Sequence, residues 1–254
     1  MCIYVYLCVF ILSIIYINCI LSMFLGNVVG LRYDRYMVID QLGVGSQGRV
    51  YKAKDINTDE ICALKTIKKP SSLEFLSTEA KHKRTLCMDL EIQALYTLKH
   101  PNIIKLLDIM QSVDEVILVT QFCENDLFSI QEQKKPSFTE QEVRLLALDI
   151  ISVLEYITSQ GWIHRDVKIE NILYHQGKYI LCDWGYARKF SYDKLIFDES
   201  FGSLYYASPE IIKNCGYIGP ECDIWSLGVV LYSLLAVSTR IRFIFNTCIE
   251  KIPI

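Results

Sequence analysis

The chain has 254 residues, of which 52% are hydrophobic and 22% are charged, and its formal net charge is −3. This length allows one large or two small domains, and the small net charge gives no electrostatic argument for a nucleic-acid partner. The ten cysteines include no C-x-x-C pair, which disfavours a zinc site or a disulfide framework and fits reduced thiols in a cytoplasmic protein.

The first 31 residues contain no charged side chain and are rich in aliphatic and aromatic residues. Such a segment is long enough to span a bilayer, and the first positive charges, Arg32 and Arg35, would leave the following chain on the cytosolic side. A membrane anchor is therefore one prediction for residues 1–31. The alternatives are a non-spanning extension from a wrongly chosen start codon and a secretory signal peptide, although the basic start and clear cleavage site of a signal are missing.

A glycine-rich segment follows the apolar stretch Tyr36–Leu42 and precedes an alternating, β-branched stretch at Arg49–Lys54. Its glycines are Gly43, Gly45 and Gly48. Glycines at this spacing let a backbone approach phosphate groups without a Cβ in the way. A dinucleotide-binding Rossmann site would need a helix after the glycines, whereas a strand pattern follows here. The segment therefore predicts a strand–turn–strand flap over a nucleotide.

Lys65 lies within the apolar stretch Ile61–Ile67, which has the pattern of a strand. A buried ammonium group needs a partner, although a lysine that reaches out to water is the alternative. The candidate partner is Glu91, in the helical pattern Leu90–Leu98. Between the two, Pro70–Arg84 is polar, and we expect an irregular, partly disordered excursion there.

The most informative segment is His164–Asn171, with the sequence HRDVKIEN between two apolar runs. Asp166 can accept the proton of an attacking hydroxyl group, and Lys168 can neutralise charge on a transferred phosphoryl group. Asn171 can offer an oxygen to a hard cation such as Mg²⁺. A charged surface loop is the alternative for a single Asp-x-Lys, but the whole segment, with partners on both sides, favours phosphoryl transfer.

Two features follow this segment along the chain. Asp183 ends a short apolar strand predicted at Tyr179–Cys182, and a carboxylate at a strand end is a good second ligand for Mg²⁺. Further on, Gly202–Glu210 is compact and rich in turn residues, and Cys222–Leu235 is apolar almost all round and is expected to be a buried helix.

Together, these motifs over about Tyr36–Ala236 resemble those of eukaryotic-type protein kinases. The resemblance implies an α+β, bilobal kinase-like fold. Its small lobe, about 36–120, would contain a five-stranded antiparallel sheet and the Glu91 helix. Its mostly helical lobe, about 124–236, would lack its last helices, and a hinge would lie near Gln121–Cys123.

The end of the chain departs from this family. After Ala236 the family continues with several helices, whereas residues 237–254 form a tail that is not similar to the family. We interpret the chain as truncated or frame-shifted at this end. The missing helices would cover the apolar face of Cys222–Leu235, so we expect that face to be exposed.

The resemblance also implies roles for individual residues. Asp166 would be the catalytic base, with Lys168, Lys65 and Glu91 as the other catalytic residues, and Asp223 would anchor the catalytic loop. The residues implied as Mg²⁺ ligands are Asn171 and Asp183. The residues implied to bind ATP are Leu42, Gly43, Gly45, Gly48, Val50, Ala63, Lys65, Thr120, Gln121, Cys123 and Leu173.

A lysine two positions after the base, Lys168, is typical of serine/threonine rather than tyrosine kinases. Within that class, Gly202–Glu210 and Tyr217–Glu221 resemble AMP-activated-kinase-related members of the calmodulin-kinase group. The predicted function is transfer of the ATP γ-phosphoryl group to serine or threonine hydroxyls of protein substrates, with Mg²⁺. The alternative is a truncated, non-catalytic protein that binds a nucleotide or partners. The sequence does not determine the oligomeric state.

Two further departures concern the site itself. Trp184 stands where the family usually has phenylalanine, so its larger ring either overpacks the site or fills a widened slot against His164. Glu199 falls about where related kinases carry an activating threonine. Either Glu199 partly orders this loop by pairing with Arg165, or Ser200 takes a phosphate instead.

Overall fold

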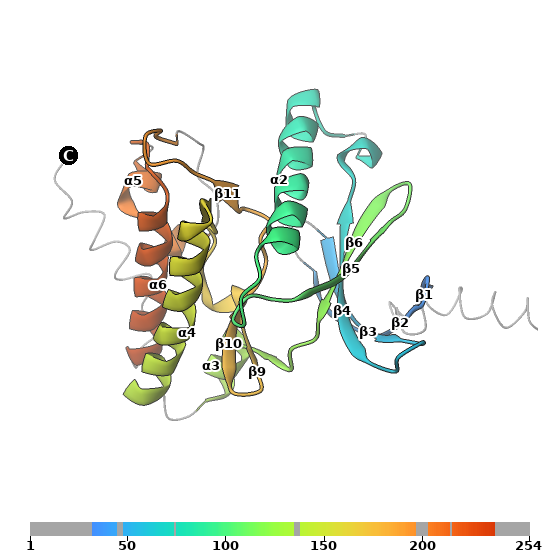
Figure 1. The fold of residues 1–254 in the computed structure, drawn as a ribbon, viewed down its shortest axis with the longest axis horizontal. Coiled ribbons are helices and arrows are strands. Elements are labelled where there is room, and N and C mark those ends of the chain that lie inside the picture. The colour runs from blue at the N-terminus through green and yellow to red at the C-terminus, as the bar shows by residue number, and fades with distance from the viewer. Residues whose placement is uncertain are drawn as a thin grey trace, which may run out of the picture. The chain divides into compact units, whose positions relative to one another are not determined.

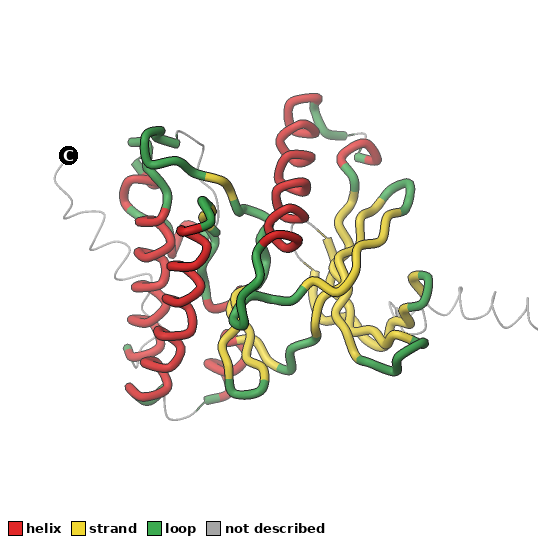
Figure 2. Tube along the Cα trace, viewed as in Figure 1, coloured by secondary structure: helices red, strands yellow, loops and turns green. Residues whose placement is uncertain are grey.

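The computed structural model describes residues 32–44, 48–73, 75–134, 138–196, 203–213 and 215–236. They divide into two compact units. The first unit contains the chain up to Lys68 together with Leu107–Phe122. The second unit contains Lys69–Leu106 together with the chain from Cys123 onward. Strands make up most of the first unit and helices most of the second (Figures 1 and 2). Five of the predicted features lie outside the described residues: the segment 1–31, Gly45, Glu199, Ser200 and the tail 237–254.

The first unit is built around a sheet with the strand order β1-β2-β3-β4-β6-β5 (Figure 1). The strands are β1 (Arg32–Tyr33), β2 (Tyr36–Val44), β3 (Gly48–Asp55), β4 (Ile61–Lys68), β5 (Leu106–Gln111) and β6 (Glu115–Gln121). The pairs from β1 through β4 to β6 are antiparallel, as predicted. The sheet has six strands instead of the predicted five, because the two-residue β1 is too short to show a periodic pattern.

The two faces of this sheet differ, as strand β4 shows. Cys62 and Leu64 are buried, whereas Ala63 and Lys65 between them are only half-buried. The side chains of the buried face form a hydrophobic cluster that contains Tyr36, Val38, Tyr51, Ala53, Cys62, Leu64, Ile117 and Val119. Because successive side chains of a strand point to opposite faces, Lys65 lies on the face opposite this cluster.

Gly48 is required by the close approach of strand β4. A Cβ at Gly48 would lie 1.6 Å from the carbonyl oxygen of Thr66, whereas a Cβ at Gly43 would meet no described atom within 4 Å. We therefore expect Gly48→Ala to lower the free energy of unfolding by about 1–3 kcal/mol. The matched Gly43→Ala is expected to change it by less than about 0.5 kcal/mol. Urea unfolding without nucleotide measures both, and equal stabilities would contradict the packing argument.

The second unit contains most of the helices. They are α2 (Thr78–Thr97), α3 (Leu127–Gln133), α4 (Glu140–Ser159), α5 (Pro209–Ile212) and α6 (Pro220–Leu235), with the short 3₁₀ turns η1 (Pro70–Ser72), η2 (Ile169–Asn171) and η3 (Leu204–Tyr206). Its strands are β7 (Asn125–Asp126), β8 (Trp162–Ile163), β9 (Ile172–His175), β10 (Lys178–Leu181) and β11 (Arg188–Lys189). They form the small sheets β10-β9-β7 and β11-β8. Helices α4 and α6 pack side by side (Figure 1).

Helix α2 begins much earlier than predicted. Ser77 caps it, because its side chain accepts a hydrogen bond from the backbone N–H of Ala80 at 3.2 Å. The expected irregular excursion was therefore wrong for residues 78–84, which form the first turns of α2. These turns are polar and bury no side chain, so they show no helical periodicity in the sequence. The buried residues of α2 are Glu91, Ala94 and Leu95.

Helix α6 contains the helix predicted at Cys222–Leu235 and has one exposed apolar face. The side chains of this face are Ile224, Trp225, Tyr232 and Leu235. The opposite face packs against α4 and includes Leu227, Val230 and Leu234. The prediction that an apolar face of this helix is exposed is therefore confirmed within the described residues.

Candidate active site

The predicted catalytic loop is anchored to α6 by a buried carboxylate. The two oxygens of Asp223 accept the backbone N–H groups of His164 and Arg165, each at 2.7 Å. Burial raises the pKa of the Asp223 carboxyl, while His164, the two N–H groups and Arg165 act in the opposite direction. Arg165 has φ = +67°, a conformation that is costly for a residue with a Cβ. The predicted anchoring role of Asp223 is confirmed.

His164 connects this loop to the chain that precedes Asp183. Its ring Nε2 lies 3.0 Å from the carbonyl oxygen of Cys182, and its Nδ1 accepts the backbone N–H of Asp166 at 3.3 Å. These partners give Nδ1 the role of acceptor and Nε2 the role of donor. The His164 ring also contacts the fully buried Trp184 ring edge to face, with centroids 4.8 Å apart. The predicted contact between Trp184 and His164 is therefore confirmed.

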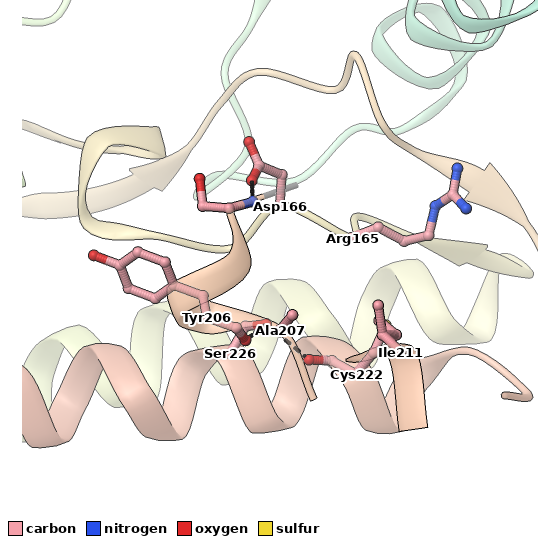
Figure 3. A pocket seen from close by; sticks show the side chains of 8 residues that line it. Arg165, Asp166, Tyr206, Ala207, Ile211, Cys222 and Ser226 are labelled. Atoms are coloured by element: carbon pink, nitrogen blue, oxygen red, sulfur yellow. Dashed lines mark hydrogen bonds between the residues drawn. The ribbon is translucent and has the colours of Figure 1, made fainter. Parts of the chain in front are cut away.

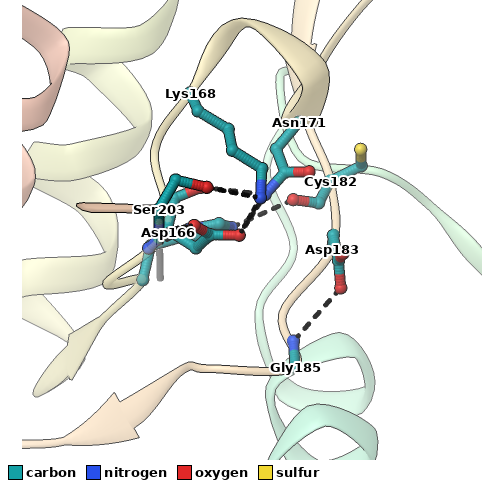
Figure 4. Close-up of polar contacts among 8 residues, drawn as sticks. Asp166, Lys168, Asn171, Cys182, Asp183, Gly185 and Ser203 are labelled. Atoms are coloured by element: carbon teal, nitrogen blue, oxygen red, sulfur yellow. Dashed lines mark hydrogen bonds and ion pairs between the residues drawn. The ribbon is translucent and has the colours of Figure 1, made fainter. Parts of the chain in front are cut away.

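Two side chains and one backbone N–H group converge on the carboxylate of the predicted base, Asp166 (Figure 4). Lys168 Nζ lies 2.6 Å from Asp166 Oδ2, and Asn171 Nδ2 donates to the same oxygen at 2.9 Å. Ser203 donates its backbone N–H to Asp166 Oδ1 at 3.1 Å, and its hydroxyl accepts a hydrogen bond from Lys168 at 3.1 Å. The carboxylate is almost fully buried, so these contacts fix its orientation.

The charge of Lys168 is stabilised where it lies. Burial alone would lower the pKa of this amine, but its hydrogen bond and charge pairing with Asp166 outweigh burial and raise the pKa. Glu170 and Asp183 add to this effect. Lys168 is therefore cationic at neutral pH, next to the carboxylate that would accept a proton.

Asn171 and Asp183 can present oxygen atoms to a cation. Asn171 uses its amide nitrogen to donate to the carbonyl oxygen and to Oδ2 of Asp166, which leaves its amide oxygen turned away from that residue. The backbone N–H of Cys182 donates to the carbonyl oxygen of Asn171 at 2.9 Å and so places Asp183 beside Asn171 (Figure 4). Asp183 has φ = +58°, again a costly conformation.

This donor set fits one metal better than others. Mg²⁺ is typically held by one or two carboxylate or amide oxygens together with substrate phosphates and water. Among the described residues, no group of three or more His, Cys, Asp and Glu side chains could hold a metal ion. Asn171 and Asp183 therefore fit a Mg²⁺ ion that is shared with a bound nucleotide.

The first unit brings together a second set of predicted residues. Strand pairing places Gly43 opposite Val50 and Val50 opposite Lys65, in one row across three strands. Ala63, two positions before Lys65 on β4, is opposite Thr120 on β6. Directly opposed residues have their side chains on the same face of a sheet. Val50, Ala63, Lys65 and Thr120 therefore share the face opposite the hydrophobic cluster.

Some predicted contacts remain predictions. Glu91 lies on α2 and is 2% exposed, so its carboxylate needs a cationic or hydrogen-bonding partner. Glu91, Cys123 and Leu173 belong to the second unit, whereas Lys65 belongs to the first. The ion pair between Lys65 and Glu91 would join the two units and stays a prediction. The other two described residues of the first unit that we predict to bind ATP are Leu42, which is exposed, and Gln121, which ends β6.

The sequence pattern did not point to Ser203. This residue lies 37 positions after Asp166, so no local spacing connects the two. Ser203 was part of the turn-rich segment Gly202–Glu210, and only the fold shows that its N–H and hydroxyl meet Asp166 and Lys168.

A small cavity lies beside the catalytic loop (Figure 3). It is lined by Arg165, Asp166, Ser203, Tyr206, Ala207, Ile211, Cys222 and Ser226, and its volume is ≈ 10 Å³. About one water molecule fills such a volume, so this cavity is too small for a nucleotide or a peptide. The hydroxyl of Ser226 beside it donates to the carbonyl oxygen of Tyr206 at 2.8 Å, which holds η3 on α6.

Ser208, which precedes α5, is fully buried, and its hydroxyl has no hydrogen-bond partner among the described residues. An unpaired buried hydroxyl costs about 1–3 kcal/mol. We therefore expect Ser208→Ala to raise the free energy of unfolding by about 1 kcal/mol in urea titrations. The contrasting variant is Ser226→Ala, which loses a buried hydrogen bond and should lower it. A destabilised Ser208→Ala would show that this hydroxyl has a partner.

Comparison with known proteins identifies the family. Residues 36–245 match the family model described as "Protein kinase domain". A probable serine/threonine-protein kinase of Dictyostelium discoideum is 34% identical over 222 residues, which cover 85% of this chain and 42% of that protein. Serine/threonine-protein kinase TIO of Arabidopsis thaliana is 37% identical over 202 residues, which cover 79% of this chain and 14% of that protein. The chain therefore belongs to the eukaryotic-type serine/threonine protein kinase family.

A further relative bears on the subgroup. The carbon catabolite-derepressing protein kinase of Candida glabrata is 37% identical over 207 residues, which cover 81% of this chain and 32% of that protein. This similarity agrees with the predicted resemblance to AMP-activated-kinase-related enzymes. The chain spans less than half the length of each of these three relatives.

Proposed function

We propose that this chain transfers the γ-phosphoryl group of ATP to serine or threonine hydroxyls of protein substrates. The observation that carries this proposal is the arrangement of Lys168, Asn171 and Ser203 around the Asp166 carboxylate. General-base catalysis needs a proton acceptor of fixed orientation, such as this carboxylate, and phosphoryl transfer needs a nearby cation. Both are present within one loop of a chain that belongs to this family.

The contacts of Asp166 support one of its carboxylate oxygens as the acceptor of the substrate's hydroxyl proton. A carboxylate offers about four lone-pair positions, and two donors occupy Oδ2 while one occupies Oδ1. The remaining position on Oδ1 would accept the proton of the substrate hydroxyl. Lys168 would then stabilise the negative charge that develops on the transferred group.

The other predicted residues would position ATP and Mg²⁺. When bound, Mg²⁺ neutralises charge on the phosphates, and Asn171 and Asp183 would hold it. Lys65 would contact the α- and β-phosphates and pair with Glu91. The remaining ATP contacts that we propose come from Leu42, Gly43, Gly45, Gly48, Val50, Ala63, Thr120, Gln121, Cys123 and Leu173.

Two measurements on the same protein test this function: thermal unfolding with and without nucleotide, and transfer of labelled phosphate. With the full chain, Mg²⁺-ATP at about 100 times its Kd is expected to stabilise the fold by ~2.7 kcal/mol, and radiolabelled phosphate should appear on serine or threonine of a protein substrate. Lys65→Met should lose both effects. The control is Lys54→Met, which removes a lysine that pairs with the exposed Asp59 and should keep both effects. A thermal shift without any transfer would favour the alternative, a non-catalytic nucleotide-binding protein.

We further propose that the kinase domain works in the cytosol. None of the six cysteines in the described part of the chain forms a disulfide, which supports a reducing compartment. No helix in the described ranges is both long enough and apolar enough to cross a bilayer. Membrane attachment through residues 1–31 stays a prediction, and fractionation of cells that express the full chain and a variant without these residues would test it.

A further inference from the structure

Tyr217 contacts the catalytic loop from a distant part of the sequence. It lies between α5 and α6 and is 7% exposed. Its hydroxyl accepts a hydrogen bond from Arg165 Nη1 at 3.0 Å. Its backbone pairs in both directions with Ile196, at 2.7 and 3.1 Å. One residue therefore joins the loop that carries the base to the segment that follows Asp183.

Arg165 receives contacts from three parts of the second unit. Asp223 accepts its backbone N–H, and the carbonyl oxygen of Tyr186 accepts its Nε at 2.8 Å. Tyr217 supplies the third contact. Arg165 directly precedes Asp166, and its side chain extends away from that residue (Figure 3). Any rotation of the Arg165 backbone would therefore also turn Asp166.

The Tyr217 hydroxyl acts as a neutral acceptor in a cationic environment. Burial raises the pKa of Tyr217, although the charge of Arg165 acts in the opposite direction, so the phenol keeps its proton at neutral pH. The second cation in this environment is Arg188. Burial and the charge of Arg165 lower the pKa of Arg188, and Tyr217 acts in the opposite direction. A hydrogen bond from a guanidinium is stronger than one between neutral groups, so the loss of this acceptor has a measurable effect.

We propose that Tyr217 is a positioning residue for phosphoryl transfer, whose hydroxyl fixes the Arg165 guanidinium and, through Arg165, the orientation of Asp166 and of residues 184–196. This inference rests on the proposed kinase function. Tyr217 also belongs to a hydrophobic cluster with Ile163, Ile196, Ile211 and Cys222, so a packing role must be separated from the role of its hydroxyl.

Tyr217→Phe makes this separation, because it keeps the ring in the cluster and removes only the hydroxyl. We expect kcat for protein phosphorylation to fall roughly 5- to 50-fold, since a small misplacement of a catalytic group costs up to about 100-fold. KM for ATP should stay within about twofold, because the nucleotide contacts are unchanged. The matched control is Tyr192→Phe, which changes an exposed tyrosine of the segment after Asp183 and should not change kcat. An unchanged kcat in Tyr217→Phe would overturn the proposal.

A double-mutant cycle shows whether the hydroxyl acts through Arg165. Arg165→Met removes the donor, so adding Tyr217→Phe to it should lower kcat by less than about twofold more. If the two substitutions instead multiply their separate effects, Tyr217 acts by another route and the proposal is wrong.

Hydrogen exchange gives a readout that does not need activity. In Tyr217→Phe, the amides of Arg165, Asp166 and Ile196 should exchange about tenfold faster than in the wild type, and Tyr192→Phe should leave them unchanged. If the wild-type chain transfers no phosphate, the proposed function fails and exchange alone decides the inference. Unchanged exchange in Tyr217→Phe would then refute the positioning role.

Discussion

Asp166→Asn is expected to lower kcat for protein phosphorylation by about 10²–10⁴-fold, the usual contribution of a general base. An amide at this position cannot accept the hydroxyl proton. It also cannot satisfy its surroundings, because Lys168, Asn171 and the backbone of Ser203 are all donors to the carboxylate. Whichever way the asparagine is turned, its NH₂ group meets another donor, so we also expect a modest loss of stability.

The measurement is incorporation of labelled phosphate into a protein substrate at saturating ATP. The matched control is Asp193→Asn, which removes an exposed carboxylate from the segment after Asp183 and should leave kcat unchanged. Nucleotide-dependent stabilisation of Asp166→Asn should persist, because Asp166 is not among the residues that we propose to contact the nucleotide. Undiminished labelling by Asp166→Asn would exclude Asp166 as the base and, with it, the proposed mechanism.

The chemistry of the second unit was predictable because its residues lie close together in the sequence. Asp166, Lys168 and Asn171 occupy one short loop, so their spacing alone brings them within reach of one another. The strands around Gly43 and Lys65 were also predictable, because alternation of side chains is a local property. Their register, which aligns Gly43, Val50 and Lys65 in one row, required the structure.

Contacts between distant segments were not predictable from one sequence. Ser203 meets Asp166 from 37 positions away, and Tyr217 meets Arg165 from 52 positions away. Both are ordinary polar residues in turn-rich segments, and no pattern in the sequence indicates which residue each of them contacts. The prediction missed the polar first turns of α2 for a different reason. A helical segment that buries no side chains has no periodic apolar pattern in its sequence.

Trp184 is the departure from the family that the structure clarifies most. The ring is fully buried against His164, as both predicted alternatives, an overpacked site and a widened slot, require. Its Nε1 has no hydrogen-bond partner among the described residues, so the fit carries a cost. Asp183 lies beside Asn171, so the residue that we propose as a Mg²⁺ ligand keeps its position before Trp184.

Asp223→Ala is expected to lower the free energy of unfolding by about 3–5 kcal/mol and to abolish measurable transfer. The carboxylate is fully buried and accepts two N–H groups of the catalytic loop, which would both lose their acceptor. The loop is least able to tolerate this loss at Arg165, whose backbone is already in a costly conformation. Asp223→Asn keeps one acceptor oxygen, so its stability should lie between those of the alanine variant and the wild type.

Chemical denaturation followed by circular dichroism measures this effect, with Glu221→Gln as the matched control on the same helix. Glu221 is exposed and accepts the backbone N–H of Gly219, which a glutamine oxygen can also accept, so the control should keep wild-type stability. If Asp223→Ala were as stable as the control, water would have to satisfy the two N–H groups. The catalytic loop would then not depend on α6 for its conformation, and the geometry around Asp166 would need another cause.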